Sequence, residues 1–345
     1  MKAVKWGVVG FGEQARKRMI PALKRIKDIE LSAVCCSGPE SAELAENELG
    51  VKCYGKLSEF LSDPEIQVVY IATPHHLHTP QAYKAIEAGK NVLVEKPIAL
   101  SVDGAHKLTE AARRKNLILG TCFPLRHHPC LRGIQEEIRS GLIGELIQAY
   151  VYLSRGKIQE KDWWKDQFHS GPMCLMDLGL YGIDLLLWLA GKRALEVFAF
   201  GKGGQSDTEL NTSVVVSLNF EGDGIGVVSA NNLIQGQANL IVIQGTKEQI
   251  TIEINWPEGD SVFKLRRNKN GVVQESWYEP LDLYQVLVDN FNQAVQGIGS
   301  YSPCCEESYS VVEASCAAIE SMKSGRTIKA GEIQRVKAPA PKYKE

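Results

Sequence analysis

Short apolar runs alternate with amphipathic stretches along residues 4–121. The apolar runs, which we predict to be strands, are Val4–Gly10, Leu31–Cys36, Val68–Ala72, Asn91–Val94 and Leu117–Thr121. The segments between them have apolar residues at helical spacing and are Glu13–Lys27, Pro39–Leu49, Pro80–Ala88 and Val102–Lys115. Strands that are apolar throughout and alternate with helices predict an α/β fold of Rossmann type, a doubly wound parallel sheet with helices on both faces.

The pattern changes after Thr121. An amphipathic segment at Pro129–Ser140 and a strand-like run at Leu146–Leu153 precede an apolar helix at Cys174–Ala190. Alternating strand patterns follow at Thr212–Asn219, Gly226–Asn231, Asn239–Gln244 and Gln249–Ile254, and helices at Tyr284–Gln296 and Glu306–Ser324. We therefore predict two domains: residues 1–122 bind a dinucleotide, and residues 123–345 form an α+β domain with a large, mainly antiparallel open sheet for substrate binding and oligomerisation.

The composition is that of a globular protein, because 44% of the residues are hydrophobic and the formal net charge is −2. No excess of Lys and Arg exists to neutralise phosphates, so we expect neither nucleic acid nor an anionic membrane as partner. The apolar stretch Leu178–Ala190 is too short to span a bilayer and contains Asp184. Nine cysteines without a CxxC pair or a secretory start indicate reduced thiols in the cytoplasm.

A glycine-rich turn follows the first predicted strand and fits the dinucleotide pattern G-x-G-x-x-G/A. Its six residues are Gly10, Phe11, Gly12, Glu13, Gln14 and Ala15. The first glycine allows the tight turn, the second lets the backbone approach a pyrophosphate, and the alanine lets the helix lie close to the strand. The helix N-terminus then offers unpaired N–H groups to the phosphates, so we predict NAD(P) binding here.

The end of the second strand, at Cys36, Ser37 and Gly38, bears on the choice of cofactor. An NAD-preferring site normally has Asp or Glu here to bind the ribose 2′-hydroxyl. In this chain no carboxylate follows the second strand before Glu40. A 2′-phosphate is then not repelled, and Ser37 with the Gly38 backbone can donate to it. We favour NADP; the alternative is that either cofactor is accepted.

The loop after the strand Val68–Ala72 lies where open α/β sheets bind ligands. Its candidate cofactor residues are Ala72, Thr73, Pro74, His75 and His78. Three histidines within four residues suggest a metal, but no cysteine or carboxylate lies near them in sequence, so we predict none.

Several motifs together give the chain a recognisable pattern. They are Gly10–Ala15, Ile71–Pro74 with His78, Glu95-Lys96-Pro97, Arg126 with His128-Pro129, Asp177-Leu-Gly-Leu-Tyr181-Gly-Ile-Asp184 and Ile243–Thr246. With these motifs the chain resembles the Gfo/Idh/MocA oxidoreductase family over essentially its whole length. The resemblance implies NAD(P)-dependent hydride transfer to or from a sugar, a cyclitol or a related polyol, and a homodimer or homotetramer.

The same resemblance makes Lys96 the catalytic lysine and places Glu95 and Lys96 beside the cofactor. An ammonium there can hydrogen-bond the reacting oxygen and favour its alkoxide-like charge. The alternative for Lys96 is a surface ion pair with Glu95. Arg126 is predicted to contact the ribose or the substrate, with a purely structural role as the alternative.

Asp177, Tyr181 and Asp184 have helical spacing, which predicts one polar stripe on an apolar helix. The family most often has histidine where Tyr181 stands, so this chain resembles the tyrosine branch that contains glucose-fructose oxidoreductase. We predict that Tyr181 relays the proton, with a pKa lowered by Lys96, and that Asp177 orients the substrate or the lysine. The alternative for Tyr181 is a buried structural tyrosine.

The substrate is then expected against Lys96, Asp177 and Tyr181, with Trp163 and Trp164 stacking on a sugar ring. For these tryptophans a place at the domain interface is an equal alternative. The predicted activity is NAD(P)-dependent oxidation or reduction at a CH–OH carbon. Its rivals are a dihydrodiol dehydrogenase-like enzyme, an NAD-dependent glycosidase of the same fold and a non-catalytic dinucleotide-sensing regulator.

Overall fold

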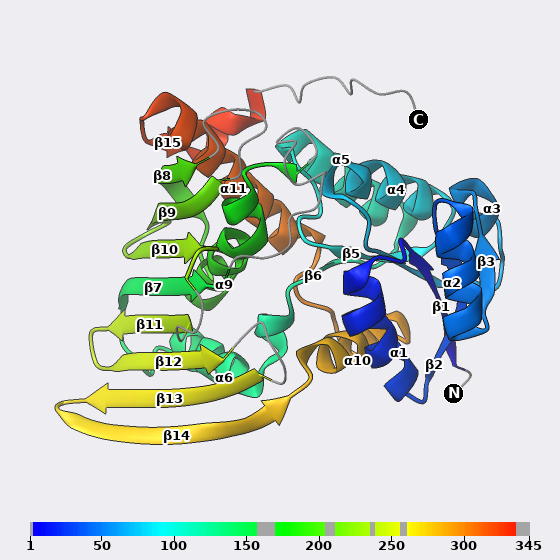
Figure 1. The fold of residues 1–345 in the computed structure, drawn as a ribbon. Coiled ribbons are helices and arrows are strands. Elements are labelled where there is room, and N and C mark those ends of the chain that lie inside the picture. The colour runs from blue at the N-terminus through cyan, green and yellow to red at the C-terminus, as the bar shows by residue number, and fades with distance from the viewer. Residues whose placement is uncertain (1–2, 157–169, 204–210, 235–238, 256–260, 336–345) are drawn as a thin grey trace.

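The computed structural model describes residues 3–156, 170–203, 211–234, 239–255 and 261–335. They form two β-sheets side by side, with helices packed between and around them (Figure 1). No helix in these ranges is both long enough and apolar enough to cross a bilayer.

The first sheet is parallel and has the strand order β3-β2-β1-β4-β5-β6. Its strands are β1 (Val4–Val9), β2 (Ile29–Cys35), β3 (Lys52–Tyr54), β4 (Val68–Ile71), β5 (Asn91–Glu95) and β6 (Leu119–Cys122). The order reverses between β1 and β4, so the carboxyl ends of these two strands flank the topological switch point. The prediction of a doubly wound parallel sheet is confirmed. Only β3 was missed, because three residues at a sheet edge carry almost no periodicity.

Helices cover both faces of this sheet. They are η1 (Ala15–Met19), α1 (Ile20–Arg25), α2 (Pro39–Leu49), α3 (Leu57–Leu61), α4 (His75–Glu87) and α5 (Val102–Lys115). Helix α4 begins five residues before the predicted start, directly after Pro74. Pro80 lies inside the helix but near its beginning, where a missing N–H removes a single intrahelical bond. The prediction of Pro80 as the first helical residue is therefore wrong.

The second sheet has nine strands in the order β14-β13-β12-β11-β7-β10-β9-β8-β15. They are β7 (Leu146–Ser154), β8 (Ala194–Gly203), β9 (Asn211–Phe220), β10 (Ile225–Asn231), β11 (Asn239–Gly245), β12 (Gln249–Asn255), β13 (Ser261–Lys269), β14 (Val272–Leu281) and β15 (Ile328–Lys329). Only β7 and β10 pair in parallel among these neighbours, so the predicted mainly antiparallel sheet is confirmed.

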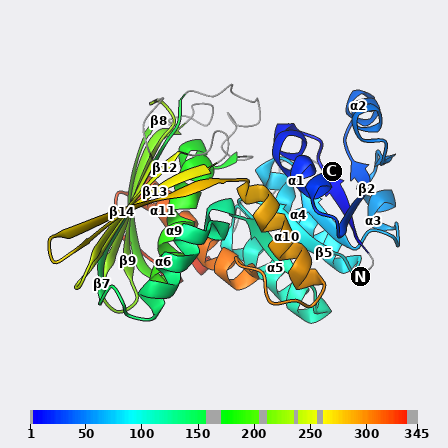
Figure 2. The same ribbon diagram turned by 90° about the horizontal axis from the view of Figure 1, so that it is seen from below.

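Helices lie on one face of this second sheet, and the other face is open (Figure 2). The covering segments are η2 (Pro124–His127), α6 (Pro129–Arg139), η3 (Leu175–Gly179), α9 (Leu180–Ala190), α11 (Cys305–Ser324) and η4 (Ala330–Arg335). Large apolar side chains remain exposed on the strands of this sheet, among them Tyr150, Phe200, Val215 and Trp277.

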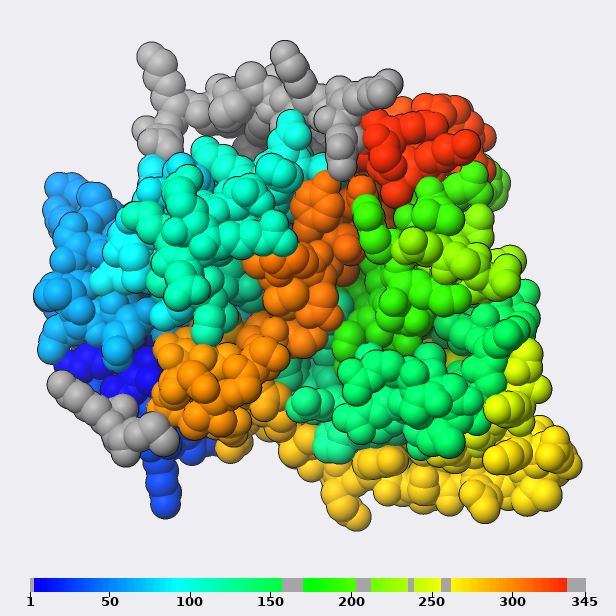
Figure 3. All heavy atoms as spheres, turned by 180° about the vertical axis from the view of Figure 1, so that it is seen from behind, coloured from blue at the N-terminus to red at the C-terminus, as the bar shows by residue number. Residues whose placement is uncertain are grey.

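One late helix returns to the first sheet. Helix α10 (Leu283–Val295) packs Leu287, Val288 and Phe291 into the same buried cluster as Trp6 of β1. The rings of Phe291 and Trp6 meet edge to face at 5.5 Å, and the Trp6 indole donates to Asn292 at 3.1 Å. Seen from behind, the segment that contains α10 and α11 lies between the two halves of the molecule (Figure 3). The core of the N-terminal sheet is thus completed by residues far along the chain.

Candidate active site

The glycine turn follows β1 directly and leads into a helix. Gly10 has a φ of +94°, and a Cβ there would lie 2.6 Å from the carbonyl oxygen of Ala72. A Cβ on Gly12 would meet no atom within 4 Å, so this backbone faces open space. Open backbone at a helix N-terminus is what a pyrophosphate requires. The residues present therefore fit NAD(P).

The other residues of the turn divide between surface and interior. Phe11 is half-buried, and the exposed Glu13 pairs with Lys17 at 2.6 Å. Ala15 is fully buried, as close helix–strand packing requires. Gln14 directs its amide into the protein, toward Glu95.

The end of β2 presents the second part of the predicted cofactor site. Cys36 is buried, whereas Ser37 and Gly38 are exposed at the start of α2. Burial raises the pKa of the Cys36 thiol, with the Glu46 carboxylate adding to the effect. Ser37 and Gly38 are therefore the accessible groups at this strand end.

The loop after β4 lies on the other side of the switch point. Ala72, Thr73 and Pro74 are half-buried, and His75 and His78 are buried. The two ring nitrogens of His78 lie 2.7 Å from the Pro97 oxygen and 2.8 Å from the Thr73 oxygen. Burial lowers the pKa of His78 to about 4. This ring connects the loops after β4 and β5. In the described ranges no three His, Cys, Asp or Glu side chains are grouped to hold a metal ion.

The Lys96 ammonium follows β5 and meets the second domain. Its Nζ donates to the carbonyl oxygens of Met176 and Asp177, at 3.2 and 2.9 Å, and to Asp177 Oδ1 at 3.1 Å. It also lies 5.0 Å from the centroid of the Tyr181 ring. The structure thus brings Lys96 together with Asp177 and Tyr181, which lie more than 80 residues later in the sequence.

Asp177 is held by two cations. Besides Lys96 it pairs with Arg155, which follows β7. Burial alone would raise the pKa of Asp177, but the charges of Lys96 and then Arg155 outweigh it and hold this pKa below its ordinary value. The cluster of two cations and one carboxylate carries a net positive charge beside Tyr181.

Tyr181 is 6% exposed, and its ring meets Phe123 edge to face at 5.8 Å. Burial raises the pKa of its phenol well above 10, and the negative charges near it add to the effect. The prediction that Lys96 lowers this pKa is therefore wrong, because the ammonium lies over the ring and desolvation dominates. This environment therefore favours the protonated phenol of Tyr181.

Glu95 is buried and is bonded to other groups of the protein. Its carboxylate accepts from the Tyr70 hydroxyl at 2.8 Å and from Gln14 at 3.2 Å. The same Gln14 amide donates to the Tyr284 oxygen at 2.6 Å. Burial raises the pKa of Glu95. The alternative of a surface Glu95–Lys96 pair is excluded, since both side chains are buried and bind other groups.

Arg126 is 2% exposed and lies in an ion-pair cluster rather than at the glycine turn. It donates to Asp184 from Nε at 2.9 Å and from an outer nitrogen at 2.7 Å, and it also pairs with Glu307. This geometry supports the structural alternative for Arg126. Asp184 consequently faces a different environment from Asp177, so the predicted single polar stripe divides between two sites. Trp163 and Trp164 lie outside the described residues.

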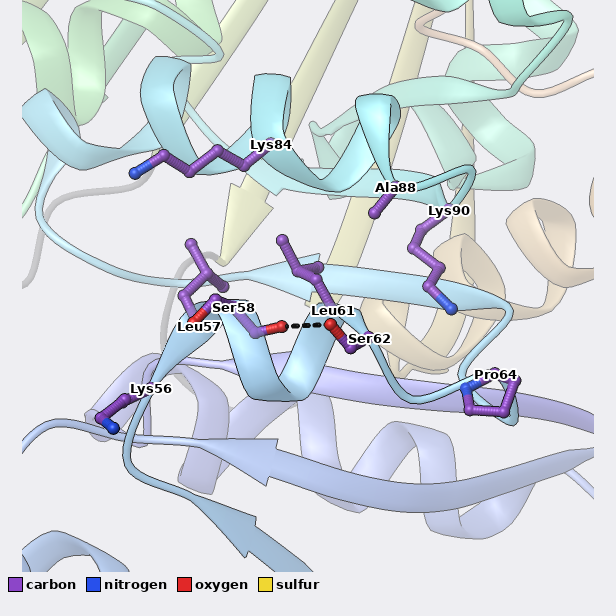
Figure 4. Close-up of a pocket in the computed structure, with 9 residues that line it drawn as sticks. All are labelled: Lys56, Leu57, Ser58, Leu61, Ser62, Pro64, Lys84, Ala88 and Lys90. Carbon is purple, nitrogen blue, oxygen red and sulfur yellow. Dashed lines mark hydrogen bonds between the residues drawn. The ribbon is translucent and has the colours of Figure 1, made fainter.

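A separate hollow of about 1210 Å³ lies between α3 and α4 (Figure 4). Lys56, Leu57, Ser58, Leu61, Ser62, Pro64, Lys84, Ala88 and Lys90 line it. Lys90 precedes β5 and donates to the oxygens of Asp63 and Ile66, just before β4, at 2.7 Å each. The hollow therefore lies at the amino edge of the sheet, opposite the glycine turn and Lys96.

Sequence reasoning missed Arg155, Tyr70 and Tyr284. An arginine directly after the central strand β7 is a weak signal that could have been noticed. Tyr70 occupies an ordinary strand position, and Tyr284 lies 270 residues from its partner Gln14. No local pattern identifies these two tyrosines.

The first domain carries the dinucleotide turn and the buried Lys96, and the second domain supplies the Tyr181 phenol. Together these groups define the class of the protein as an NAD(P)-dependent oxidoreductase. The family model described as "Oxidoreductase family, NAD-binding Rossmann fold" matches residues 4–123, and the "GFO/IDH/MocA C-terminal domain" matches residues 131–251. The chain belongs to the Gfo/Idh/MocA oxidoreductase family.

Two relatives are named for activities on sugars or sugar derivatives. The chain is 25% identical over 336 residues to the 1,5-anhydro-D-fructose reductase of Ensifer adhaerens, covering 96% of this chain and 98% of that protein. It is 34% identical over 163 residues to the D-xylose 1-dehydrogenase (NADP(+)) of Hypocrea jecorina, covering 44% and 42% of the two chains. The crystal structure of aldose-aldose oxidoreductase from Caulobacter crescentus complexed with glycerol has a TM-score of 0.85 at 19% identity, covering 95% and 100%, which supports the fold.

Proposed function

We propose that this protein is an NADP-dependent oxidoreductase of a sugar, a cyclitol or a related polyol. The observation that carries the proposal is the position of the Lys96 ammonium, 3.1 Å from the Asp177 carboxylate and 5.0 Å from the centre of the Tyr181 ring. Gln14 of the glycine turn reaches the same cluster through Glu95 and Tyr284. Cofactor turn and reacting groups therefore share one edge of the sheet.

Each residue has a distinct task in this proposal. Lys96 hydrogen-bonds the reacting oxygen and stabilises negative charge that develops on it. Tyr181 donates a proton to that oxygen during reduction and takes it back during oxidation. Asp177, charged and held by Lys96 and Arg155, fixes the direction of the ammonium. When bound, the nicotinamide supplies or accepts the hydride.

Reduction of a carbonyl group suits this site. A phenol whose pKa is raised well above 10 keeps its proton at neutral pH, so this proton is present when a carbonyl substrate binds. The net positive cluster of Lys96, Asp177 and Arg155 favours an alkoxide over a neutral carbonyl. The similarity to an anhydrofructose reductase over almost the whole chain supports the same direction.

Three further properties are part of the proposal. NADP is preferred because no carboxylate occupies residues 33–39, where Ser37 and Gly38 are exposed. On the open face of the second sheet, Phe200 is 66% exposed and Trp277 is 67% exposed. This face pairs with another copy of the chain to form a dimer or tetramer, and light scattering would measure the mass of the assembly. All nine cysteines are free, which supports a cytoplasmic location.

The test is a panel of aldoses, inositols, trans-diols and anhydroketoses, each with NADP(H) and with NAD(H). Absorbance of the reduced nicotinamide is recorded in both directions. We expect turnover of at least one sugar or polyol, a higher kcat/KM for NADP than for NAD, and faster reduction than oxidation at neutral pH. Lys96→Met should lower kcat by about 100-fold or more while cofactor fluorescence still reports binding.

Two results would contradict the proposal. Cofactor binding without turnover of any substrate would favour a dinucleotide-sensing regulator. Turnover that Lys96→Met leaves unchanged would place the chemistry elsewhere in the molecule. As a matched control, Lys56→Met alters an exposed lysine at the opposite edge of the sheet and should leave kcat as in the wild type.

A further inference from the structure

Tyr284 connects the cofactor turn to the proposed proton donor. Its oxygen accepts from Gln14 Nε2 at 2.6 Å, and its hydroxyl is also hydrogen-bonded to that of Tyr181. Gln14 belongs to the glycine turn, Tyr284 to α10 and Tyr181 to α9. Three elements distant in sequence thus meet through hydroxyl and amide groups.

The amide of Gln14 is itself fixed in orientation. Its two N–H groups are used by Glu95 Oε1, at 3.2 Å, and by Tyr284. The Tyr70 hydroxyl donates to the same Glu95 oxygen at 2.8 Å. With one lone pair of the Tyr284 oxygen occupied by Gln14, its other lone pair accepts from the Tyr181 hydroxyl.

The backbone of Tyr284 is equally well held. Asp282 caps α10, and its Oδ1 accepts from the backbone N–H groups of Tyr284 and Gln285 at 3.0 and 3.2 Å. Arg25 of α1 pairs with the other oxygen of Asp282. The first turn of α10 is therefore tied to the helix that follows the glycine turn, and Tyr284 has little freedom to move.

We propose that Tyr284 is a positioning residue, whose oxygen accepts a hydrogen bond from the Tyr181 hydroxyl and so fixes the position of that hydroxyl. The inference rests on the proposed function. Tyr284 would act through Tyr181 and need not touch the substrate. The geometry also implies that Gln14 contributes to this orientation, in addition to its place in the cofactor turn.

The physical basis is desolvation. A buried hydroxyl without a hydrogen-bond partner is costly, so the acceptor that Tyr284 offers holds the Tyr181 hydroxyl in one orientation. The titratable groups around the pair are Glu95, Lys96, Cys122, Tyr70 and Asp177, with Arg155 and His75 beside Asp177. The carboxylates of Glu95 and Asp177 and the hydrogen bond to Tyr284 all raise the pKa of Tyr181, so this environment favours the phenol.

The variant Tyr284→Phe removes only the hydroxyl. With the best substrate of the panel, we expect kcat to fall about 10-fold, the worth of one hydrogen bond, while both KM values and the cofactor Kd change less than about twofold. The acidic limb of kcat for oxidation should move to lower pH, because the hydrogen bond to Tyr284 raises the pKa of Tyr181. The matched control Tyr83→Phe alters a partly exposed ring on α4 and should behave as the wild type.

A double variant tests whether the effect passes through Tyr181. Tyr181→Phe with Tyr284→Phe should be no slower than Tyr181→Phe alone. Gln14→Met, which removes the donor to Tyr284, should lower kcat in the same direction and serves if Tyr284→Phe does not fold. Three results would each overturn the inference. Tyr284→Phe could leave kcat and its acidic pH limb unchanged, it could change KM alone, or its loss in kcat could add fully to that of Tyr181→Phe in the double variant.

A measurement without turnover separates this inference from the proposed function. In protein labelled with fluorotyrosine, the fluorine resonance of residue 181 is assigned from its absence in Tyr181→Phe. Its titration should move to lower pH in Tyr284→Phe and stay in place in Tyr83→Phe. That result supports the hydrogen bond even if no substrate is turned over; an unmoved titration contradicts it.

Discussion

Asp177 holds the Lys96 ammonium in place while sharing its charge with a second cation. Its two oxygens are divided between Lys96 and Arg155, so neither cation fully neutralises it and neither is fully occupied by it. A carboxylate bound by Lys96 alone would hold the ammonium more tightly and leave it less available to a substrate oxygen. We therefore expect Arg155 to affect the reaction through its charge, from a position that the sequence patterns did not indicate.

This argument predicts the behaviour of Arg155 variants. Arg155→Leu should lower kcat/KM by about 10-fold, corresponding to one charge-assisted hydrogen bond of about 1.4 kcal/mol, because Lys96 then pairs with Asp177 alone. Arg155→Lys restores the charge without the planar fork and should recover part of the loss. Steady-state kinetics on both variants checks it. Equal kcat/KM for all three proteins would show that Arg155 does not act on Lys96.

At the scale of elements, two π-helical segments lie next to the site. They are η1, directly after the glycine turn, and η3, which carries Asp177. The hydrophobic pattern predicted uninterrupted helices here, and the helices are present in the predicted places. The local widening within η3 accompanies the approach of Lys96, which takes the carbonyl oxygens of Met176 and Asp177. Such turns occur often at functional sites.

Helix α10 is the element that joins the distant chain segment to the first sheet, and Phe291 is its central contact. The ring is fully buried, 5.5 Å from that of Trp6 and 4.9 Å from that of Tyr301. Phe291→Ala should lower the free energy of unfolding by about 3–5 kcal/mol, measured by urea denaturation. Leu142→Ala, at a side chain 61% exposed, is the control and should change it little. Similar losses for both would contradict the role of α10.

For the whole molecule, buried histidines should make stability depend on pH. Burial lowers the pKa of His78 to about 4 and that of His127 to about 3, against an ordinary value of 6.5. Between these values the unfolded chain binds more protons than the folded chain, so stability falls as the pH drops below 6.5. Each histidine should cost about 2 kcal/mol at pH 5 relative to neutral pH.

Urea denaturation between pH 7.5 and pH 5 measures this slope. His127→Phe keeps the ring that stacks on Tyr301, with centroids 5.5 Å apart, and removes the titrating group. The variant should lose about 2 kcal/mol less than the wild type over this range, whatever its stability at neutral pH. A slope equal to that of the wild type would show that His127 is protonated in the folded chain as readily as in the unfolded chain.

Local patterns were sufficient for much of the fold. Alternation of apolar runs with amphipathic helices identified the parallel sheet, and the bounds of α2 and α5 agree with the prediction residue for residue. The glycine turn was also predictable from the local sequence. Gly10 has a positive φ, which glycine adopts most easily, and the absence of a side chain at Gly12 leaves open space beside the backbone. These features depend on neighbours in sequence.

What the tertiary structure alone decided concerns contacts between segments far apart. Arg126 turned inward to Asp184, Arg155 joined Asp177, and Tyr284 reached Tyr181 from a helix near the end of the chain. The pKa of Tyr181 moved opposite to the prediction because burial, which no spacing reveals, outweighed the charge of Lys96. The sequence by itself determined which chemical groups are available and on which elements they lie. Folding determined which of them meet and how much water they lose, and those two quantities set their chemistry.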